Sequence, residues 1–430
     1  MTRRLLFIGI PESHARQSIA RAQRIGFTVI VADSEEHLRR HAGLVADADR
    51  QVVVDYESYD ELTALATMLD GEAGLDAIFT FKERSLLPTS RVIADRGLPG
   101  NSPACVETCL NKLQTRESLA TAGLPGPAFE LCHSERDLAA FATRAASIVV
   151  AKPLDAQGSV GVTTIAPGAD TGAAYRLAAA HGSGAILAEE FVVGPEISVE
   201  AGVFAAAPVV FGATEKLLYD GTFVERGQAT PHDGPGLTPR ACQELLERVV
   251  DALGIEFGPI HLELFLSPSG PVVGEVHTRY GGDCIVPLTE HSTGQDMTTP
   301  VFAELAGSPM TVRRAPARQH AGIRYLSVAP GRVAGVSGVD EARAIDGVLE
   351  VRVDCAPGER VGPPRSSDDR PGYVIAAGPS RVQLERTLTE ALDAVRIVVE
   401  DAHAGMVGSP PPARGAPRTM LGAGASRAHR

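Results

Sequence analysis

Ionisable side chains recur at every second position along residues 261–279, on both sides of a short turn. Apolar runs flank Ser267-Pro268-Ser269-Gly270, so this stretch is predicted to form a β-hairpin. If the hairpin is symmetric about Ser269, Glu263 and Glu275 lie directly opposite each other. Because side chains alternate between the two faces of a strand, one face then carries His261, Glu263, Glu275, His277 and Arg279. The other face carries Leu262, Leu264, Leu266, Val272 and Val276.

Two facing carboxylates indicate a site for a divalent cation. Like charges directly across an antiparallel pair repel each other, and a cation bound by both removes the repulsion. Magnesium fits, because it takes oxygen ligands at about 2.1 Å and commonly combines one or two carboxylates with phosphates and water. The alternative is a solvated sheet face on which Arg279 and its neighbours balance the charge. The flexible Gly281-Gly282 before Asp283 favours a functional site.

A lysine and a small-residue loop are candidates for the positive partners that a phosphate needs. Lys152 ends an apolar strand, and the loop Gln157-Gly158-Ser159-Val160-Gly161 follows it. Backbone N–H groups of such a loop can surround a phosphate while the lysine neutralises it. The segment is not a Walker A loop, since Gly-Lys-Ser/Thr and a following helix are both missing. Taken alone, the loop is also compatible with a surface turn, and Lys112 with a solvated lysine.

The elements that must position these residues follow from the hydrophobic pattern. Over residues 5–96, short apolar runs alternate with helical stretches, which indicates βαβ units on a parallel sheet. The first turn, residues 9–14, lacks the G-x-G-x-x-G spacing of dinucleotide-binding folds. Later patterns predict a hairpin from strands at 148–151 and 162–165, a helix at 238–253, and a third region from residue 322 that ends in a helix near 384–399. Residues 404–430 are rich in Pro, Gly, Ala and Arg and are predicted to be a disordered tail.

Composition excludes several classes of protein. The chain has 430 residues, of which 44% are hydrophobic and 22% charged, and its mean hydropathy of +0.03 excludes wholesale disorder and a membrane-embedded protein. A formal charge of −13 argues against nucleic acid as a partner. The six cysteines form no C-x-x-C pair, so neither a zinc knuckle nor a disulfide framework is indicated. No signal-peptide pattern and no run of about 20 apolar residues is found, so we expect no membrane association and a cytoplasmic location.

In their order along the chain, the motifs resemble those of the ATP-grasp enzymes. The resemblance rests on Asn111-Lys112 with Arg116, on Val150-Ala151-Lys152-Pro153 and its loop, on Ala188–Val192, on Gly194–Glu200, on Glu263, and on Glu275-Val276-His277-Thr278-Arg279. It implies a multidomain chain of α/β and α+β class with the ATP-grasp fold. The implied parts are an N-terminal βαβ (preATP-grasp) domain at 1–104, a two-lobed nucleotide-binding region at 105–310 with a flexible lid at about 134–190, and a C-terminal α+β, biotin-carboxylase-like portion at 311–403.

The same resemblance implies a role for individual residues. The implied ATP contacts are Lys112, Lys152, Gly158, Ser159, Val160, Gly161, Glu189, Glu190, Phe191, Val192 and Glu196. Glu263 and Glu275 are expected to hold Mg²⁺, while Arg279 and Lys152 act on the transferring phosphoryl group. His277 stands where the family usually has Asn. Imidazole is a poorer match for magnesium than a carbonyl oxygen, so His277 would favour Mn²⁺ or hydrogen-bond a phosphate.

The third region is similar to the carboxylate-amine ligase branch of the family. That branch implies attack of an amino acid carboxylate on the γ-phosphate of ATP, followed by capture of the acyl phosphate by an amine. The expected substrate residues are Lys216, Glu225, Arg226, Gly281 and Gly282, although a surface loop is the alternative for residues 214–232. A carrier-protein thiol as the acceptor and a homodimer both stay open. A bicarbonate-activating carboxylase or purine-pathway enzyme, and a non-catalytic ATP-binding module, are the competing hypotheses.

Overall fold

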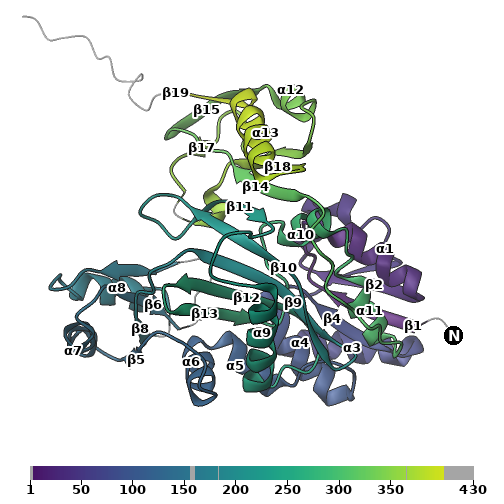
Figure 1. Ribbon diagram of the computed structural model, residues 1–430. Helices are drawn as coiled ribbons and strands as arrows, with labels where there is room; N and C mark the ends of the chain where they lie inside the picture. Colours follow the sequence, from purple (N-terminus) through teal and green to yellow (C-terminus); the bar gives the residue numbers. More distant parts are fainter. Residues whose placement is uncertain (1–2, 155–159, 183, 365, 401–430) are drawn as a thin grey trace, which may run out of the picture.

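The computed structural model describes residues 3–154, 160–182, 184–364 and 366–400, and within them the chain forms four β-sheets with helices packed on them (Figure 1). This mixed α/β architecture agrees with the predicted fold class. Residues 155–159 and 401–430, which include Gly158, Ser159 and the predicted tail, lie outside the described residues.

The N-terminal sheet is parallel, as the alternating pattern predicts. In the order β3-β2-β1-β4 it contains β1 (Arg3–Ile8), β2 (Phe27–Asp33), β3 (Arg50–Val53) and β4 (Ala77–Thr80). Its helices are α1 (Ala15–Ile25), α2 (Glu35–Arg40), η1 (Ala42–Leu44), α3 (Tyr59–Ala73) and α4 (Glu83–Arg96). Alternate residues of β1 enter separate cores, because Leu5 and Phe7 face one side and Leu6 and Ile8 the other. The loops after β1, β2 and β4 therefore meet at the carboxyl edge, where open α/β sheets bind ligands.

The large sheet is antiparallel and has eight strands in the order β13-β12-β9-β10-β11-β14-β18-β16. These are β9 (Glu196–Phe204), β10 (Ala207–Leu218), β11 (Glu225–Thr230), β12 (Gly258–Ser267), β13 (Gly270–His277), β14 (His320–Tyr325), β16 (Val348–Val353) and β18 (Gly372–Gly378). The helix α9 (Pro239–Leu253) covers one face, where its Leu246 packs with Leu262 and Leu264 of β12. The helices α10 (Ile285–Thr293) and α11 (Thr299–Leu305) connect the other face to the N-terminal sheet, since Phe302 shares a core with Phe7.

A smaller antiparallel sheet forms the arm at the left of Figure 1. In the order β5-β8-β6-β7 it contains β5 (Phe129–Cys132), β6 (Val149–Pro153), β7 (Thr163–Ile165) and β8 (Ile186–Glu190), with α7 (Glu135–Ala145) and α8 (Gly172–Ala180) packed on it. The predicted β6–β7 hairpin is confirmed by the pairing of Val149 with Ile165. The helices α5 (Pro103–Leu110) and α6 (Lys112–Thr121) lead into this arm, and Asn111 caps α6 by accepting from the Gln114 N–H.

The C-terminal residues build a further small sheet in the order β17-β15-β19, from β15 (Gly331–Ser337), β17 (Arg360–Val361) and β19 (Arg396–Glu400). The remaining helices are α12 (Val339–Arg343), η2 (Ser367–Asp369) and α13 (Arg381–Ala394). The prediction of one helix up to Val399 is wrong, because α13 ends at Ala394 and β19 follows. The β-branched run Ile397-Val398-Val399 favours a strand and explains the difference.

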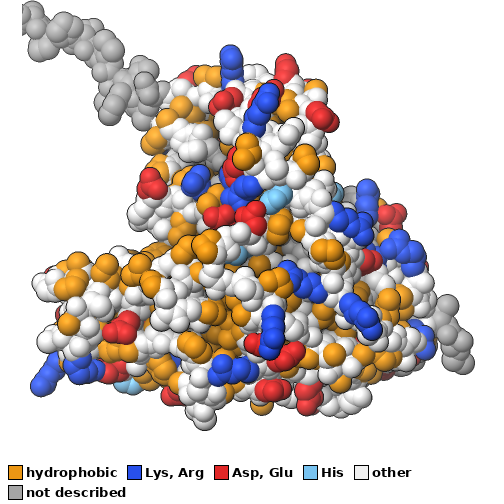
Figure 2. Space-filling view, viewed as in Figure 1, with side chains coloured by type: hydrophobic (Ala, Val, Ile, Leu, Met, Phe, Trp, Pro, Cys, Tyr) orange, Lys and Arg blue, Asp and Glu red, His pale blue; other side chains and the backbone are white. Residues whose placement is uncertain are grey.

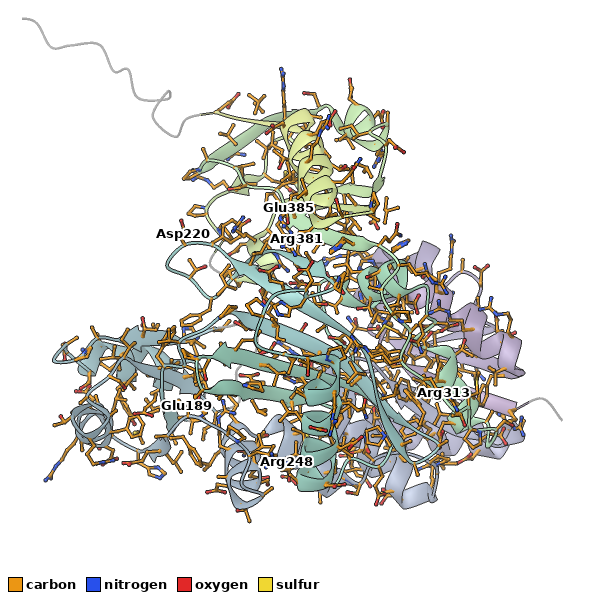
Figure 3. All side chains as sticks on the ribbon, viewed as in Figure 1. Glu189, Asp220, Arg248, Arg313, Arg381 and Glu385 are labelled. Carbon is orange, nitrogen blue, oxygen red and sulfur yellow. The ribbon has the colours of Figure 1, made fainter. Side chains whose placement is uncertain are left out.

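The predicted third region is joined to the large sheet, although β15, β17 and β19 form a small sheet of their own. Its strands β14, β18 and β16 continue the large sheet beyond β11. Arg324 of β14 donates to Glu385 of α13, and Arg381 of the same helix pairs with Glu215 of β10. Figure 3 labels Arg381 and Glu385 on α13. The predicted boundary at residues 104 and 105 falls inside α5. The division into domains therefore stays a prediction.

The surface carries charges of both signs. Figure 2 shows Lys and Arg side chains interspersed with Asp and Glu over the visible face, without a broad area of one sign. Among the helices of the described residues, none has the length and apolar content of a membrane span.

Candidate active site

The hairpin of β12 and β13 brings the predicted acidic residues to one face, but by a different register from the predicted one. Ser267 pairs with Gly270, so the turn contains only Pro268 and Ser269. Continued from that turn, the pairing would set Leu262 opposite Glu275 and aim the Glu275 carboxylate at the core. A β-bulge between Leu262 and Leu264 shifts the register by one residue. Beyond the bulge His261 pairs with His277, as the symmetric hairpin predicts, and the Glu275 side chain returns to the face of Glu263. Glu263 thus lies opposite two residues, Gly274 and Glu275, and the predicted symmetric pairing of Glu263 with Glu275 is wrong.

Glycine at the bulge allows the two strands to approach each other. A Cβ at Gly274 would lie 3.1 Å from the Phe265 ring and 3.2 Å from the Glu263 carbonyl oxygen. The bulge also changes which valine enters the core. Val273, rather than the predicted Val272, packs with Val276 and Leu264 in the cluster under α9.

Basic groups surround the Glu275 carboxylate. His277 Nε2 lies 3.4 Å from Glu275 Oε2, and Lys152 Nζ lies 3.9 Å from Glu275 Oε1. Burial would raise the pKa of Glu275, but the charge of Lys112, the hydrogen bond with His277 and the charge of Lys152 hold it well below its usual range. The other ring nitrogen of His277, Nδ1, is buried and has no hydrogen-bond partner among the described residues.

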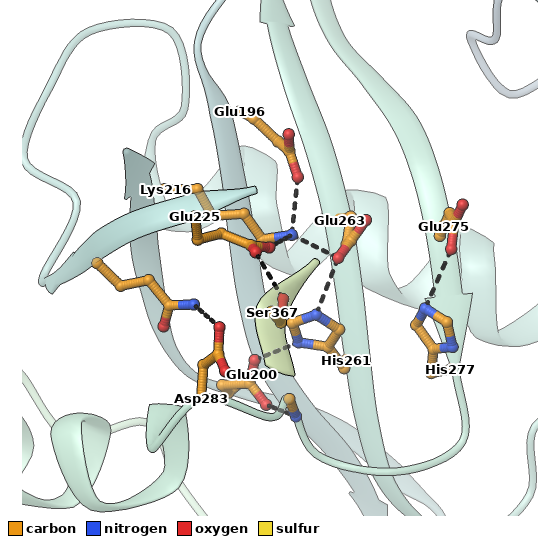
Figure 4. Close-up of polar contacts among 12 residues, drawn as sticks. Glu196, Glu200, Lys216, Glu225, His261, Glu263, Glu275, His277, Asp283 and Ser367 are labelled. Carbon is orange, nitrogen blue, oxygen red and sulfur yellow. Dashed lines mark hydrogen bonds and ion pairs between the residues drawn. The ribbon is translucent and has the colours of Figure 1, made fainter. Parts of the chain in front are cut away.

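The second predicted metal ligand, Glu263, shares a buried lysine with Glu196. Lys216 Nζ lies 2.5 Å from Glu263, 2.7 Å from Glu196 and 3.8 Å from Glu225 (Figure 4). Burial would lower the pKa of Lys216, but the charges of Glu263 and Glu196 raise it well above its usual value. Lys216, expected in the substrate pocket, thus joins Glu196, expected to contact ATP, to Glu263, expected to hold the metal.

This arrangement corrects one step of the sequence argument. The repulsion between facing carboxylates is not left for a cation to remove, because Lys216 neutralises Glu263 while Lys112 and Lys152 neutralise Glu275. Lys216 is far from β12 in sequence, so the pattern of the hairpin alone does not reveal it.

His261 is held by a carboxylate that the sequence analysis did not identify. Glu200 of β9 is fully buried, and its Oε1 lies 2.5 Å from His261 Nδ1 while its Oε2 accepts from the Gly281 N–H at 2.9 Å. Burial would lower the pKa of His261, but the charge of Glu200 and its hydrogen bond raise the pKa to about 9. Gly281 is required here, because a Cβ would lie 2.7 Å from the His261 ring.

Several polar groups of β8 and the residue after it, which were expected to contact ATP, are already bonded within the protein. Glu189 is buried, and its carboxylate accepts from Arg116 Nε at 2.5 Å and pairs with Lys152 Nζ at 2.7 Å. The N–H groups of Glu190 and Phe191 donate to the carbonyl oxygens of Ala128 and Ile148. Glu189 therefore fixes the direction of Lys152, and Figure 3 shows Glu189 on the arm.

Arg279 is oriented by another residue that the sequence analysis missed. Its Nε lies 2.7 Å from Glu83 Oε2, and its Nη1 donates to the Tyr280 carbonyl oxygen at 2.8 Å. Glu83 starts α4 directly after β4, at the carboxyl edge of the N-terminal sheet. That position, immediately after a buried parallel strand, is the signal that could have identified it.

A cavity of about 600 Å³ connects these elements. Of the predicted site residues it is lined by Lys112, Lys152, Val160, Glu275 and His277, and Glu83, Arg84, Arg116 and His181 also line it. Glu196, Lys216 and Glu263 do not line this cavity. Gly161 packs closely against the arm, because a Cβ there would lie 2.9 Å from the Pro153 ring.

The predicted substrate residues Gly282, Glu225 and Arg226 lie near the contacts that Arg370 and Ser367 of the C-terminal region make with the large sheet. Arg370 donates to Asp283 at 2.8 and 2.5 Å and stacks 3.6 Å over the Tyr325 ring. Asp283 and Cys284 both have positive φ, at 52° and 64°, directly after Gly282. Glu225 lies within 3.5 Å of Ser367, whereas Arg226 is exposed and bonds the Leu218 carbonyl oxygen.

The comparisons with known proteins agree with this geometry. The ATP-grasp domain family matches residues 146–287, and the family described as L-amino acid ligase C-terminal domain 2 matches residues 324–400. D-alanine–D-alanine ligase of Bordetella pertussis is 30% identical over 236 residues, which cover 52% of this chain and 74% of the relative. The chain belongs to the ATP-grasp ligases.

Solved structures resemble this ligase over almost its whole length. L-amino acid ligase from Bacillus licheniformis superposes with a TM-score of 0.77 at 23% identity, over 93% of this chain and 99% of that chain. N5-carboxyaminoimidazole ribonucleotide synthetase from Thermotoga maritima reaches 0.69 at 19% identity, over 93% and 100%. Both likenesses establish the fold of the ligase. Enzymes of this family use ATP, typically with Mg²⁺.

Proposed function

We propose that this ligase joins the carboxylate of an amino acid to the amine of a second amino acid or amine, through an acyl phosphate, with release of ADP and phosphate. The observation that carries the proposal is the approach of Lys152 of the arm to Glu275 of the large sheet, at 3.9 Å, on the wall of one cavity. A cation for a phosphate and a carboxylate for a metal are thereby held next to each other. The amino acids named in the relatives, D-alanine and L-amino acids, support the substrate class.

The residues around the cavity fit ATP phosphates. Lys112 and Lys152 supply positive charge, and Glu189 keeps Lys152 directed into the cavity. From the family resemblance we assign the adenine to residues 189–192, where the N–H groups of Glu190 and Phe191 are already bonded, and the ribose to Glu196. An incoming ribose hydroxyl would share the Glu196 carboxylate with Lys216.

The donor set also fits magnesium, because Glu263 and Glu275 present carboxylate oxygens on the same face of the hairpin. When bound there, the ion would neutralise charge on the phosphate oxygens. Lys216 lies 2.5 Å from Glu263 and would give up part of that contact. His277 Nδ1 has no hydrogen-bond partner among the described residues, although it lies 3.6 Å from Glu83 Oε2, and it suits a phosphate oxygen or a softer ion such as Mn²⁺.

The proposed chemistry has two steps. A substrate carboxylate oxygen bonds to the γ-phosphorus as the bond to the ADP oxygen breaks. The amine nitrogen then attacks the acyl carbon, phosphate leaves, and the amine loses a proton. We assign the stabilisation of the transferring phosphoryl group to Arg279, whose Nε is held by Glu83. Closure of the arm would exclude water from the acyl phosphate.

Phosphate release from ATP, measured with every amino acid singly and in pairs and with mass spectrometry of the products, tests the proposal. We expect phosphate release with particular pairs, a dipeptide mass, and loss of both when EDTA is added. A requirement for bicarbonate would instead support a carboxylase, and ATP binding without phosphate release would support a non-catalytic module. Formation of a thioester with a carrier protein would show that the acceptor is a thiol and not an amine.

A further inference from the structure

Three side chains with metal-ligating atoms meet at the carboxyl edge of the N-terminal sheet, in a cluster that the proposed function does not use. Glu12 lies in the loop after β1, and His37 and His41 follow β2, one on α2 and one at its C-terminal end. His37 Nε2 lies 3.3 Å from Glu12 Oε1, and His41 Nε2 lies 3.5 Å from the same oxygen. The three ligand atoms lie within 4.8 Å of one another.

The backbone and a second carboxylate fix the orientation of His37. Asp33 is fully buried at the end of β2, and its carboxylate oxygen Oδ2 lies 2.8 Å from His37 Nδ1. The same Oδ2 accepts from the Ile10 N–H at 2.7 Å. Histidines that ligate metals commonly hydrogen-bond a carboxylate through the other ring nitrogen, which leaves Nε2 directed at the ion.

We propose that Glu12, His37 and His41 form a binding site for a divalent transition ion of the zinc type. A tetrahedral ion with bonds of about 2.0–2.2 Å separates neighbouring ligand atoms by about 3.3–3.6 Å. The two distances to Glu12 Oε1 match this spacing, and both exceed the usual length of a hydrogen bond. Two imidazoles and one carboxylate leave a fourth position for water or another ligand.

The surroundings of the site define both its selectivity and its connection to the rest of the fold. Imidazole ligands select zinc, cobalt or nickel over magnesium, so this site would differ from the carboxylate pair of the hairpin. Arg352 of β16 lies 3.8 Å from Glu12 Oε2, and the charge of Lys82 also acts on Glu12. These cations weaken cation binding, and they favour an anionic fourth ligand. Through Arg352, the ion would link the N-terminal sheet to the C-terminal strands.

The test is metal binding to the full chain without a polyhistidine tag, after treatment with EDTA and dialysis. We expect one equivalent of Zn²⁺ by elemental analysis, and visible d–d absorption when Co²⁺ is used as the probe. His41→Ala and Glu12→Gln should weaken Co²⁺ binding at least about 100-fold, and Asp33→Asn about 10- to 100-fold. His133→Ala, which removes an exposed histidine outside the cluster, is the matched control and should bind like the wild type.

Thermal unfolding of the metal-free variants establishes that they are folded. If His41→Ala does not fold, Glu12→Gln decides, since Glu12 is partly exposed in a loop. Absence of Zn²⁺ and Co²⁺ uptake by the wild type would overturn the proposal. Equal uptake by the wild type and Glu12→Gln would also overturn it. Neither result bears on the ligase activity, which is assayed separately.

Discussion

Lys152 Nζ and Glu275 Oε1 lie 3.9 Å apart, although Lys152 belongs to β6 of the arm and Glu275 to β13 of the large sheet. A rotation of the arm therefore changes the distance between the group expected to bind phosphate and the group expected to bind metal. Glu189, on the arm, holds Lys152, while Arg116 of α6 bonds both Glu189 and the Val273 carbonyl oxygen of β13. Arg116, which also lines the cavity, thus connects the two sheets.

Replacement of Glu275 by Gln keeps the shape of the side chain and removes its charge. We expect kcat to fall about 100- to 1,000-fold, as for the loss of one group that stabilises a transition state, while nucleotide binding persists through Lys112 and Lys152. Steady-state phosphate release and nucleotide titration measure the two effects. Glu244→Gln, in an exposed pair with Arg240, is the control. Normal turnover in Glu275→Gln would remove this residue from the proposed metal site.

Replacement of Lys216 by Met removes the lysine that pairs with Glu196, and it leaves Glu263 with only His261 Nε2, at 3.3 Å, as a basic partner. We expect the free energy of unfolding to fall by about 3 kcal/mol, because removal of one partner from a buried ion pair leaves an uncompensated charge. Urea unfolding at neutral pH measures the change. Arg240→Met, which breaks an exposed pair, should cost less than about 1 kcal/mol. Similar losses in both variants would contradict the buried network.

Replacement of Gly274 by Ala tests the β-bulge. The added Cβ would press on the Glu263 carbonyl oxygen and the Phe265 ring, so the two carboxylates should shift relative to each other. We expect a fall in kcat of at least about tenfold, which corresponds to about 1.4 kcal/mol of activation free energy. Gly335→Ala is a matched control, because Gly335 also lies at a register shift but has open space around it. Equal kcat values for the two variants would argue against a role for the bulge.

Burial of His14 predicts a pH dependence of stability. Burial, with a smaller contribution from the charge of Arg21, lowers the pKa of His14 to about 3. The unfolded chain takes up a proton near pH 6.5 and the folded chain does not, so the free energy of unfolding falls as the pH drops below about 6.5. His14→Leu removes the imidazole, and with it the fall in the free energy of unfolding that its protonation in the unfolded chain causes. Relative to the wild type, the variant should therefore gain about 2 kcal/mol between pH 7.5 and pH 5.

Chemical unfolding at the two pH values measures the gain of the His14→Leu variant. His133→Leu, which replaces an exposed histidine, should track the wild type. An unchanged difference between His14→Leu and the wild type would show that His14 is protonated in the folded chain.

Hydrophobic patterning was sufficient for the parallel N-terminal sheet and for the two hairpins, because both depend on local periodicity. It also placed Glu263 and Glu275 on a common face, although the register between them was wrong. A hairpin with a two-residue turn and a bulge puts Glu263 and Glu275 on the same face as a symmetric hairpin without a bulge would. The alternation of residue types along the strands is the same in both, so it cannot distinguish them.

Two partners of the ionisable residues were beyond sequence reasoning. Lys216 and Glu200 come from β10 and β9, and only the order of strands in the folded chain brings them to the hairpin. Glu83 differs, because its place at the start of α4, shortly after β4, was a usable signal. The end of α13 was missed for a different reason, since an apolar run such as residues 395–399 fits a helix and a strand equally well.

The bulge at Gly274 has a consequence for how this hairpin can vary. Deletion of one residue at the bulge would leave a regular ladder in which Glu275 lies opposite Glu263 and His277 opposite His261, so both side chains would stay on the nucleotide side. Deletion of two residues there would set Glu275 opposite Leu264 and turn its side chain into the packed layer beneath α9. The loss of one residue from β13 should therefore be tolerated, because it only removes the bulge, whereas the loss of two should demand a compensating insertion nearby.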